Sequence, residues 1–213
     1  MATRCCCEDV GCIMETNTAL RWEWRVFVPS VAEYVPSLTM PLNIVPRESY
    51  ELYILNASRS GFENVKIRNG VLDIKRIKNV NADGLEQWEP VFKAAFPVKK
   101  DDIIKGLGPW GPPAAVLVRD RYTIEQLIEE CVAPDPALRA VCVHKSRRGF
   151  VFAECLGETV DLLIDDVATQ SLSLEHEDPA LILAALRALG LDPHANTNYP
   201  RGIMHALAIG CGK

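Results

Sequence analysis

The stretch Arg21-Trp22-Glu23-Trp24-Arg25-Val26-Phe27-Val28 alternates charged residues with large apolar ones. Side chains of a β-strand point alternately to the two faces of a sheet, so this stretch predicts a strand with one charged face and one apolar face. The alternation returns in four later stretches, at 65–68, 72–75, 141–147 and 172–177. If these strands close into a barrel, their charged faces line a shared lumen of Arg, Lys and Glu side chains. Such a lumen suits a polyanion and its metal ions.

The overall composition limits the class of protein. The chain has 213 residues, of which 48% are hydrophobic, and this is enough for a packed core in one large domain. A net charge of −5 argues against a nucleic-acid-binding face, which needs a broad basic surface, so we predict no nucleic-acid partner. Because no run of about 18 apolar residues occurs, we expect no membrane span. The first residues contain no apolar leader, so we expect a cytoplasmic protein.

The cysteines divide the chain unevenly. Four of the eight, Cys5, Cys6, Cys7 and Cys12, lie within residues 1–19. We predict that residues 1–19 form a mobile Cys-rich N-terminal tail and that residues 20–213 form a single domain. A soft-metal cluster in the tail is the alternative, but three adjacent cysteines lack the CxxC spacing of a zinc site.

Local patterns predict the other elements of the domain. Strands are expected at 21–28, 50–56, 64–68, 71–77, 138–147, 150–156, 158–164 and 171–176. Helices are expected at 86–95, 123–131, 180–189 and 203–209, with a Gly/Pro-rich connector at 99–113 and a turn at 198–202. Asn69-Gly70 predicts a two-residue hairpin turn between antiparallel strands. Thr123 and Gly190 are expected to cap helices.

The apolar sides of the charged strands need cover from other parts of the chain. Trp22, Trp24, Ile67 and Ile74 have the opposite parity to the charges. We therefore expect them on the outer face of the barrel, beneath helices. The helix expected at 180–189 offers a row of leucines for this contact.

The charged sides of the strands carry the candidate phosphate ligands. Six basic residues have the parity of the predicted lumen: Arg25, Lys66, Arg68, Lys75, Lys145 and Arg147. Arginine holds phosphate oxygens through a rigid fork, and lysine supplies a point charge. A chain of phosphates needs several of each from different strands, so we predict that these six side chains point into one cavity. The residues alone leave open the alternative that they are ordinary solvated strand faces.

Four glutamates are the candidate metal ligands: Glu23, Glu154, Glu158 and Glu175. Carboxylate oxygens bind hard cations, and Mg²⁺ commonly uses few carboxylates together with water and substrate phosphates. Glu154 and Glu158 share a parity if one strand runs through both. The alternative is that these four are salt-bridge partners or surface charges.

Taken in order, these motifs resemble the CYTH superfamily, the triphosphate tunnel metalloenzymes, over about residues 20–205. The family's first-strand signature, Glu-x-Glu-x-Lys, is similar to residues 21–25. Its paired basic strand resembles 65–68, its next Lys-bearing strand 72–75, its Lys-x-Arg strand 145–147 and its last Glu-x-Glu strand 173–175. At both Glu-x-Glu positions the first Glu is absent from this chain, since Arg21 and Ser173 stand there.

The resemblance implies a fold and a chemistry. The implied fold class is α+β, an eight-stranded antiparallel tunnel-like β-barrel with helices packed outside. Members of the family hold a triphosphate with Lys and Arg and place Mg²⁺ or Mn²⁺ on glutamates, and the metal assists attack at phosphorus. The partner so implied is a small molecule that contains a triphosphate.

Three functions are consistent with these residues. The first is a divalent-metal phosphohydrolase acting on triphosphate or a triphosphorylated small molecule, with an adenylate cyclase-like enzyme as its nearest variant. The second is a catalytically impaired polyphosphate- or nucleotide-binding module, since the basic residues are present and two glutamates are missing. The third is an ordinary α+β domain with charged surfaces. Neither a nucleic acid nor a membrane is expected as a partner.

Overall fold

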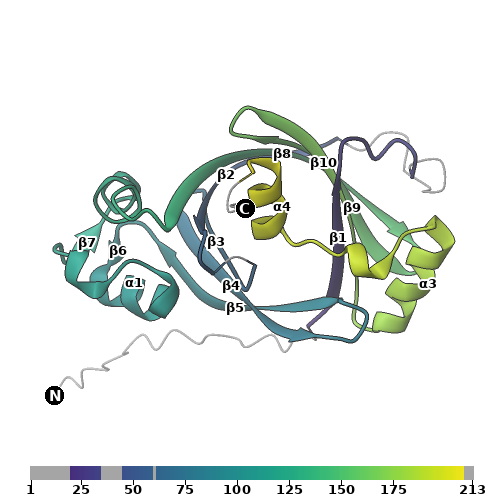
Figure 1. The fold of residues 1–213 in the computed structure, drawn as a ribbon, viewed down its shortest axis with the longest axis horizontal. Helices are drawn as coiled ribbons and strands as arrows, with labels where there is room; N and C mark the ends of the chain where they lie inside the picture. The colour runs from purple at the N-terminus through teal and green to yellow at the C-terminus, as the bar shows by residue number, and fades with distance from the viewer. Residues whose placement is uncertain (1–19, 35–44, 60, 209–213) are drawn as a thin grey trace, which may run out of the picture.

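The computed structural model describes residues 20–34, 45–59 and 61–208. Eight antiparallel strands of this part form a closed barrel, with helices outside its wall (Figure 1). The strands are β1 (Trp22–Val28), β2 (Arg47–Asn56), β3 (Glu63–Arg68), β4 (Val71–Val80), β5 (Glu86–Ala95), β8 (Leu138–Phe152), β9 (Cys155–Ile164) and β10 (Val167–His176). The predicted fold class, and the tunnel-like barrel implied by the resemblance to the CYTH superfamily, are confirmed. The tail predicted at 1–19 lies outside the described residues.

The barrel closes through strands that are distant in sequence. Around the wall the order is β1-β10-β9-β8-β2-β3-β4-β5, and β5 pairs with β1 to close the ring. The predicted hairpin joins β3 to β4, and its turn residues Asn69 and Gly70 have φ angles of 51° and 70°. Positive φ at both central residues is what a two-residue hairpin turn of this kind requires, and Asn and Gly tolerate it best.

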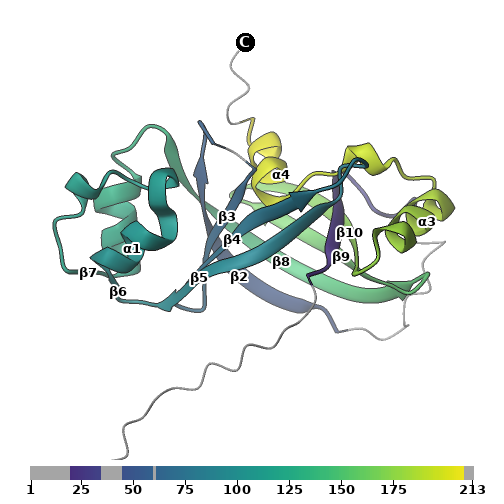
Figure 2. The same cartoon turned by 90° about the horizontal axis from the view of Figure 1, so that it is seen from below.

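The helix predicted at 86–95 is wrong, because these residues form β5 (Figure 2). Trp88, Val91 and Phe92 favour a strand as much as a helix. Pro90 pairs with Lys75 where the β4–β5 register shifts, which is where a sheet accommodates a residue without an N–H. Without β5 the strands β4 and β1 would each be an open edge of the sheet. Pairing with both edges stabilises residues 86–95 as a strand, and the local sequence pattern does not indicate this pairing.

The connector predicted at 99–113 is also wrong in part. Residues Lys100–Leu107 form helix α1, and Gly108–Trp110 form a 3₁₀ turn. The short strands β6 (Val98–Lys99) and β7 (Arg121–Tyr122) pair beside it, and helix α2 (Ile124–Leu127) follows. Thr123 caps α2 as predicted, since its side chain accepts a hydrogen bond from the Gln126 N–H. None of the helices in the described residues is long and apolar enough to cross a membrane.

The outer apolar face of the barrel lies beneath helices, as expected. Ile67 and Ile74 are buried in one cluster with residues of α1 and α2. Trp24 is buried in a second cluster beneath α3 (Pro179–Leu189), and Trp22 packs against its edge. Helix α3 ends at Gly190 as predicted, with a left-handed backbone at that residue. The cover therefore comes from two groups of helices on different sides of the barrel (Figure 1).

Helix α4 (Tyr199–Ala206) lies over one end of the barrel (Figures 1 and 2). The sequence predicted a turn at 198–202 and a helix only from 203, but Asn198 caps an earlier start by accepting the Arg201 N–H. Ile203 and Met204 of α4 pack with inward-facing apolar residues such as Leu55 and Val143. Apolar side chains therefore fill this end of the lumen, and the charged residues lie further along the barrel.

Candidate functional site: a charged cavity in the barrel

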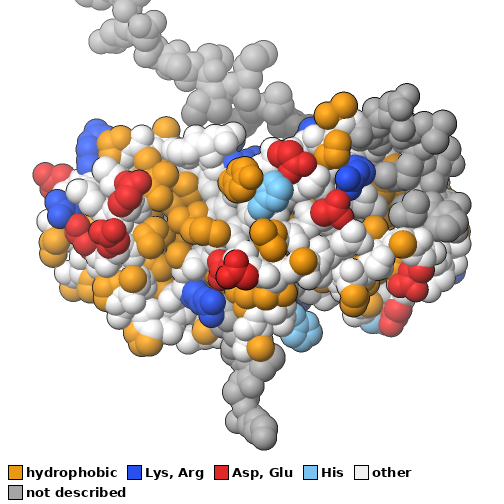
Figure 3. Space-filling view, turned by 90° about the horizontal axis from the view of Figure 1, so that it is seen from above, with side chains coloured by type: hydrophobic (Ala, Val, Ile, Leu, Met, Phe, Trp, Pro, Cys, Tyr) orange, Lys and Arg blue, Asp and Glu red, His pale blue; other side chains and the backbone are white. Residues whose placement is uncertain are grey.

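The six predicted basic side chains line one cavity of about 160 Å³ inside the barrel. They come from β1 (Arg25), β3 (Lys66 and Arg68), β4 (Lys75) and β8 (Lys145 and Arg147). The prediction that the charged strand faces share a cavity is confirmed, and the role of these residues as phosphate ligands stays a prediction. On the outer face seen in Figure 3, by contrast, the Lys and Arg side chains of the described residues are scattered among acidic and apolar ones.

Three of the four predicted metal ligands line the same cavity: Glu23, Glu158 and Glu175. The fourth, Glu154, does not. The strand predicted at 138–147 continues to Phe152 as β8. The strand predicted at 150–156 is wrong, because the chain turns within it at Ala153 and Glu154 and β9 begins at Cys155. Glu154 has a positive φ of 68° in this turn and is exposed. The shared parity with Glu158 is therefore broken by the hairpin turn.

A buried carboxylate that the sequence analysis missed lies behind the basic residues. Glu51 on β2 is only 3% exposed. One of its oxygens, Oε1, lies 2.6 Å from an Arg147 nitrogen and 3.3 Å from an Arg68 nitrogen. The other, Oε2, lies 3.1 Å from Lys145 Nζ and 3.5 Å from Lys66 Nζ. Four of the six cavity cations thus share one internal counter-ion.

Neutral donors complete the surroundings of Glu51. The Tyr53 hydroxyl donates to Oε2 over 3.1 Å and accepts from Lys145 Nζ over 2.6 Å, and the Ser49 hydroxyl donates to Oε1. Burial alone would raise the pKa of Glu51, but Lys145, Lys66 and Arg147 hold that pKa well below its ordinary value. Glu51 is therefore ionised and fully partnered. Its only sequence signal was a Glu at alternate spacing with Tyr53 and Leu55, which does not tell the inside of a sheet from its outside.

The carboxylates that line the cavity form a negative patch next to the cations. Glu23 and Glu175 are direct cross-strand partners. Burial and the nearby Glu23 carboxylate raise the pKa of Glu175 above its ordinary value. Glu23 also pairs with Arg25, whose Nε lies 3.2 Å from the carboxylate. A cation at this patch would relieve the repulsion between the carboxylates.

These carboxylates fit a metal ion only in part. Among the residues that the structure describes, no three His, Cys, Asp or Glu side chains are gathered closely enough to hold a metal ion by themselves. The donor chemistry nevertheless suits Mg²⁺ or Mn²⁺ bound by one or two carboxylates together with phosphate oxygens and water. The patch can therefore hold such an ion only with oxygens from another source.

Tyr199 at the start of α4 lines the cavity on the side where apolar side chains of α4 fill the end of the lumen. Lys145 Nζ lies 3.3 Å from the centre of the Tyr199 ring, and Arg25 Cζ lies 4.3 Å from it. Two cations therefore contact one aromatic ring, which stabilises them away from water. The neighbouring Asn198 is buried and donates to Glu86 over 3.1 Å. Neither Tyr199 nor Asn198 was predicted as a site residue, because both fall within the turn predicted at 198–202.

The arrangement leaves the six cations unequal. Arg25 is paired with Glu23, and four others are paired with Glu51. Lys75 is exposed and forms no ion pair with any described residue. An anion entering the cavity would meet Lys75 unpaired and would have to share the other cations with internal carboxylates.

Comparison with known proteins gives similarity at the level of fold. No family model and no curated protein matches the sequence. One similar solved structure is a Hippeastrum protein described as a candidate adenylyl cyclase with a dominant triphosphatase activity. It has 14% identity and a TM-score of 0.43, over 80% of this chain and 88% of that one. Another is a candidate adenylate cyclase of Bacillus halodurans, with 10% identity and a TM-score of 0.45, over 86% and 95% of the two chains.

Proposed function

We propose that the barrel binds the triphosphate group of a small molecule in the charged cavity and hydrolyses it slowly with Mg²⁺ or Mn²⁺. One observation carries the proposal: six cations from four strands meet in a single cavity of about 160 Å³. Guanidinium and ammonium groups are the usual partners of phosphate oxygens. Six cations are more than a bound molecule with a single carboxylate group would need.

We propose that the metal ion binds together with the phosphates. Glu23, Glu158 and Glu175 would supply its protein ligands, and phosphate oxygens the others. When bound, such an ion polarises a phosphoryl oxygen. The six basic side chains bind and orient the phosphates, since they line the cavity from four different strands.

Tripolyphosphate is expected to bind, and Lys75→Ala is expected to weaken that binding roughly 10- to 150-fold. The range corresponds to the loss of one charge-assisted contact of about 1.5–3 kcal/mol. Lys75 is the informative position because its removal leaves no described carboxylate without a partner. Isothermal titration calorimetry on the full chain measures the dissociation constants, and a rise in melting temperature with ligand checks them.

Lys78→Ala is the matched control for this experiment. Lys78 lies on the same strand, is exposed, and does not line the cavity. We expect it to leave the affinity for tripolyphosphate unchanged. Equal losses in both variants would mean that binding follows net charge and not the cavity. If the full chain binds neither tripolyphosphate, ATP nor thiamine triphosphate, the proposed function is wrong.

Hydrolysis is tested separately from binding, by phosphate release from tripolyphosphate with Mg²⁺, with Mn²⁺ and with a chelator. We expect slow release that requires the metal, because the described part of the chain lines the cavity with only three carboxylates, of which one is paired with Arg25. Glu175→Gln should remove this release and retain tripolyphosphate binding. Release that continues in the chelator would contradict the metal-dependent part of the proposal.

A further inference from the structure

The buried carboxylate of Glu51 is surrounded by more donors than it can satisfy. Four cations and two hydroxyl groups lie within 3.5 Å of its two oxygens. A carboxylate offers about four lone-pair sites to such donors. Among the cations, the two longest contacts are 3.3 Å to Arg68 and 3.5 Å to Lys66, so these two are the least satisfied. The donors around Glu51 can therefore serve a second anion.

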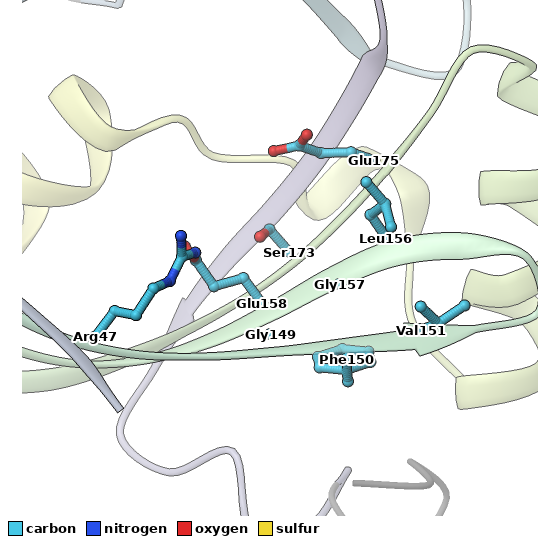
Figure 4. Close-up of a pocket in the computed structure, with 9 residues that line it drawn as sticks. All are labelled: Arg47, Gly149, Phe150, Val151, Leu156, Gly157, Glu158, Ser173 and Glu175. Carbon is cyan, nitrogen blue, oxygen red and sulfur yellow. The ribbon is translucent and has the colours of Figure 1, made fainter. Parts of the chain in front are cut away.

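The same cations carry an excess of positive charge away from water. The side chains of Lys145 and Arg147 are 1% and 12% exposed, and that of Glu51 has no exposed surface. Four cations against one carboxylate leave an excess of three positive charges. Glu158 offsets little of it, because its Oε2 lies 3.9 Å from Arg147 and is shared with Arg47, at 3.6 Å, which lines a neighbouring cavity (Figure 4). An external anion would relieve this excess.

Glu51 lies across the barrel from the candidate metal ligands. In the ring of eight strands β2, which carries Glu51, is directly opposite β1, which carries Glu23. Glu175 is the cross-strand partner of Glu23 on β10. The cations contact Glu51 on one side and line the cavity together with Glu23 and Glu175 on the other. An anion in the cavity would therefore share its cations with a carboxylate that lies behind them.

Glu51 acts on such an anion in two opposite ways. It holds the cations in place, which favours binding because less side-chain freedom is lost when the ligand arrives. It also repels the ligand, and repulsion between charges a few ångströms apart is strong in a site shielded from water. This repulsion grows with the charge of the ligand, whereas the benefit of fixed side chains is the same for every ligand. For a highly charged ligand the repulsion outweighs the benefit.

We infer that Glu51 is a specificity-determining residue that competes with phosphates for the cations of the cavity and disfavours free triphosphate relative to its metal complex. The inference rests on the proposed function and narrows its ligand from any triphosphate to a triphosphate that carries a divalent cation. Free tripolyphosphate has about four to five negative charges at neutral pH, because its end phosphates lose a second proton near pH 6. A divalent cation lowers this charge, and the repulsion from Glu51 falls in proportion.

The test compares the wild type with Glu51→Gln on the full chain by isothermal titration calorimetry. The ligands are orthophosphate, pyrophosphate and tripolyphosphate, each with a chelator and with Mg²⁺. We expect Glu51→Gln to bind metal-free tripolyphosphate about tenfold or more tightly than the wild type does. The gain should be smaller for the two shorter ligands and for the Mg²⁺ complex, because each of them carries less charge. A variant that is only less well packed would lose affinity for every ligand and would not show this order.

Glu48→Gln is the matched control for the affinities. It removes one negative charge from the same strand, but Glu48 is exposed and does not line the cavity. We expect it to leave all three affinities as in the wild type. Melting curves with and without ligand show whether Glu51→Gln is folded. If it is unfolded alone, tripolyphosphate should refold it, because the ligand supplies the missing negative charge and binds only the folded state.

The outcomes separate this inference from the proposed function. If the wild type binds tripolyphosphate and Glu51→Gln binds it no more tightly, or if the gain does not follow the charge of the ligand, the inference is overturned and the proposed function stands. The inference also fails if Glu51→Gln stays unfolded at tripolyphosphate concentrations that saturate the wild type. Binding by Glu51→Gln alone would support the competition and contradict the proposed function of the wild type. If neither protein binds any of the ligands, both proposals fail.

Discussion

Glu51→Gln is expected to lower the free energy of unfolding by about 3–5 kcal/mol at neutral pH, the usual cost of removing one partner from a buried ionic cluster. The carboxylate is buried and has four cations within 3.5 Å. Glutamine preserves the shape but leaves Lys145 and Arg147 close together without their counter-ion. Urea-induced unfolding, followed by circular dichroism, measures the loss.

The pH dependence separates this electrostatic cause from a packing defect. The pKa of Glu51 is held below its ordinary value, so its stabilising contribution is complete above about pH 4.3, the ordinary pKa of a glutamate. It is lost as the pH falls from there through the folded-state pKa. The difference between wild type and Glu51→Gln should therefore shrink in acid, whereas a packing defect would persist.

Glu48→Gln provides the control for Glu51. Glu48 is on the same strand but is exposed, and among the described residues its carboxylate lies 2.8 Å from His144 Nε2. We expect a change below about 1 kcal/mol, as for other surface pairs. A loss in Glu51→Gln no larger than this would show that the internal cluster does not stabilise the barrel. If anions bind to the same cations, tripolyphosphate should stabilise Glu51→Gln more than the wild type.

Trp24→Ala is expected to cost about 3–5 kcal/mol of unfolding free energy, as large-to-small substitutions of buried aromatic residues do. Trp24 is fully buried between the barrel wall and α3, in a cluster with Ile182 and Leu186. Its indole Nε1 also donates to the carbonyl oxygens of Asp192 and Pro193, over 3.2 Å and 3.1 Å. Removing the ring therefore leaves a cavity and also removes the hydrogen bonds that hold residues 192–193, just after α3, against the barrel.

Trp22→Ala is the matched control, because Trp22 is on the same strand and the same face but is only half-buried at the edge of the cluster. Its loss should be clearly smaller when both variants are unfolded in urea. Trp24→Phe keeps a ring and loses the Nε1 donor, which separates packing from hydrogen bonding. A loss below about 1 kcal/mol in Trp24→Ala would show that α3 does not depend on this side chain.

The period of two in the sequence determined which side chains share a face. It placed all six basic residues and three glutamates in one lumen and Trp24, Ile67 and Ile74 outside it, because strand geometry repeats every two residues. Local backbone chemistry likewise determined the turn at Asn69-Gly70 and the end of α3 at Gly190.

Tertiary structure decided the features that depend on distant partners. Residues 86–95 form β5 because they pair with both β4 and β1 and so close the barrel. The local pattern of those residues favours neither a helix nor a strand strongly. Glu154 was excluded from the site by a turn that only the β8–β9 pairing reveals. Glu51 and Tyr199 belong to the site because strands from different parts of the barrel wall and helix α4 meet in the lumen. The sequence of a single strand or turn does not indicate which residues lie opposite it across a barrel.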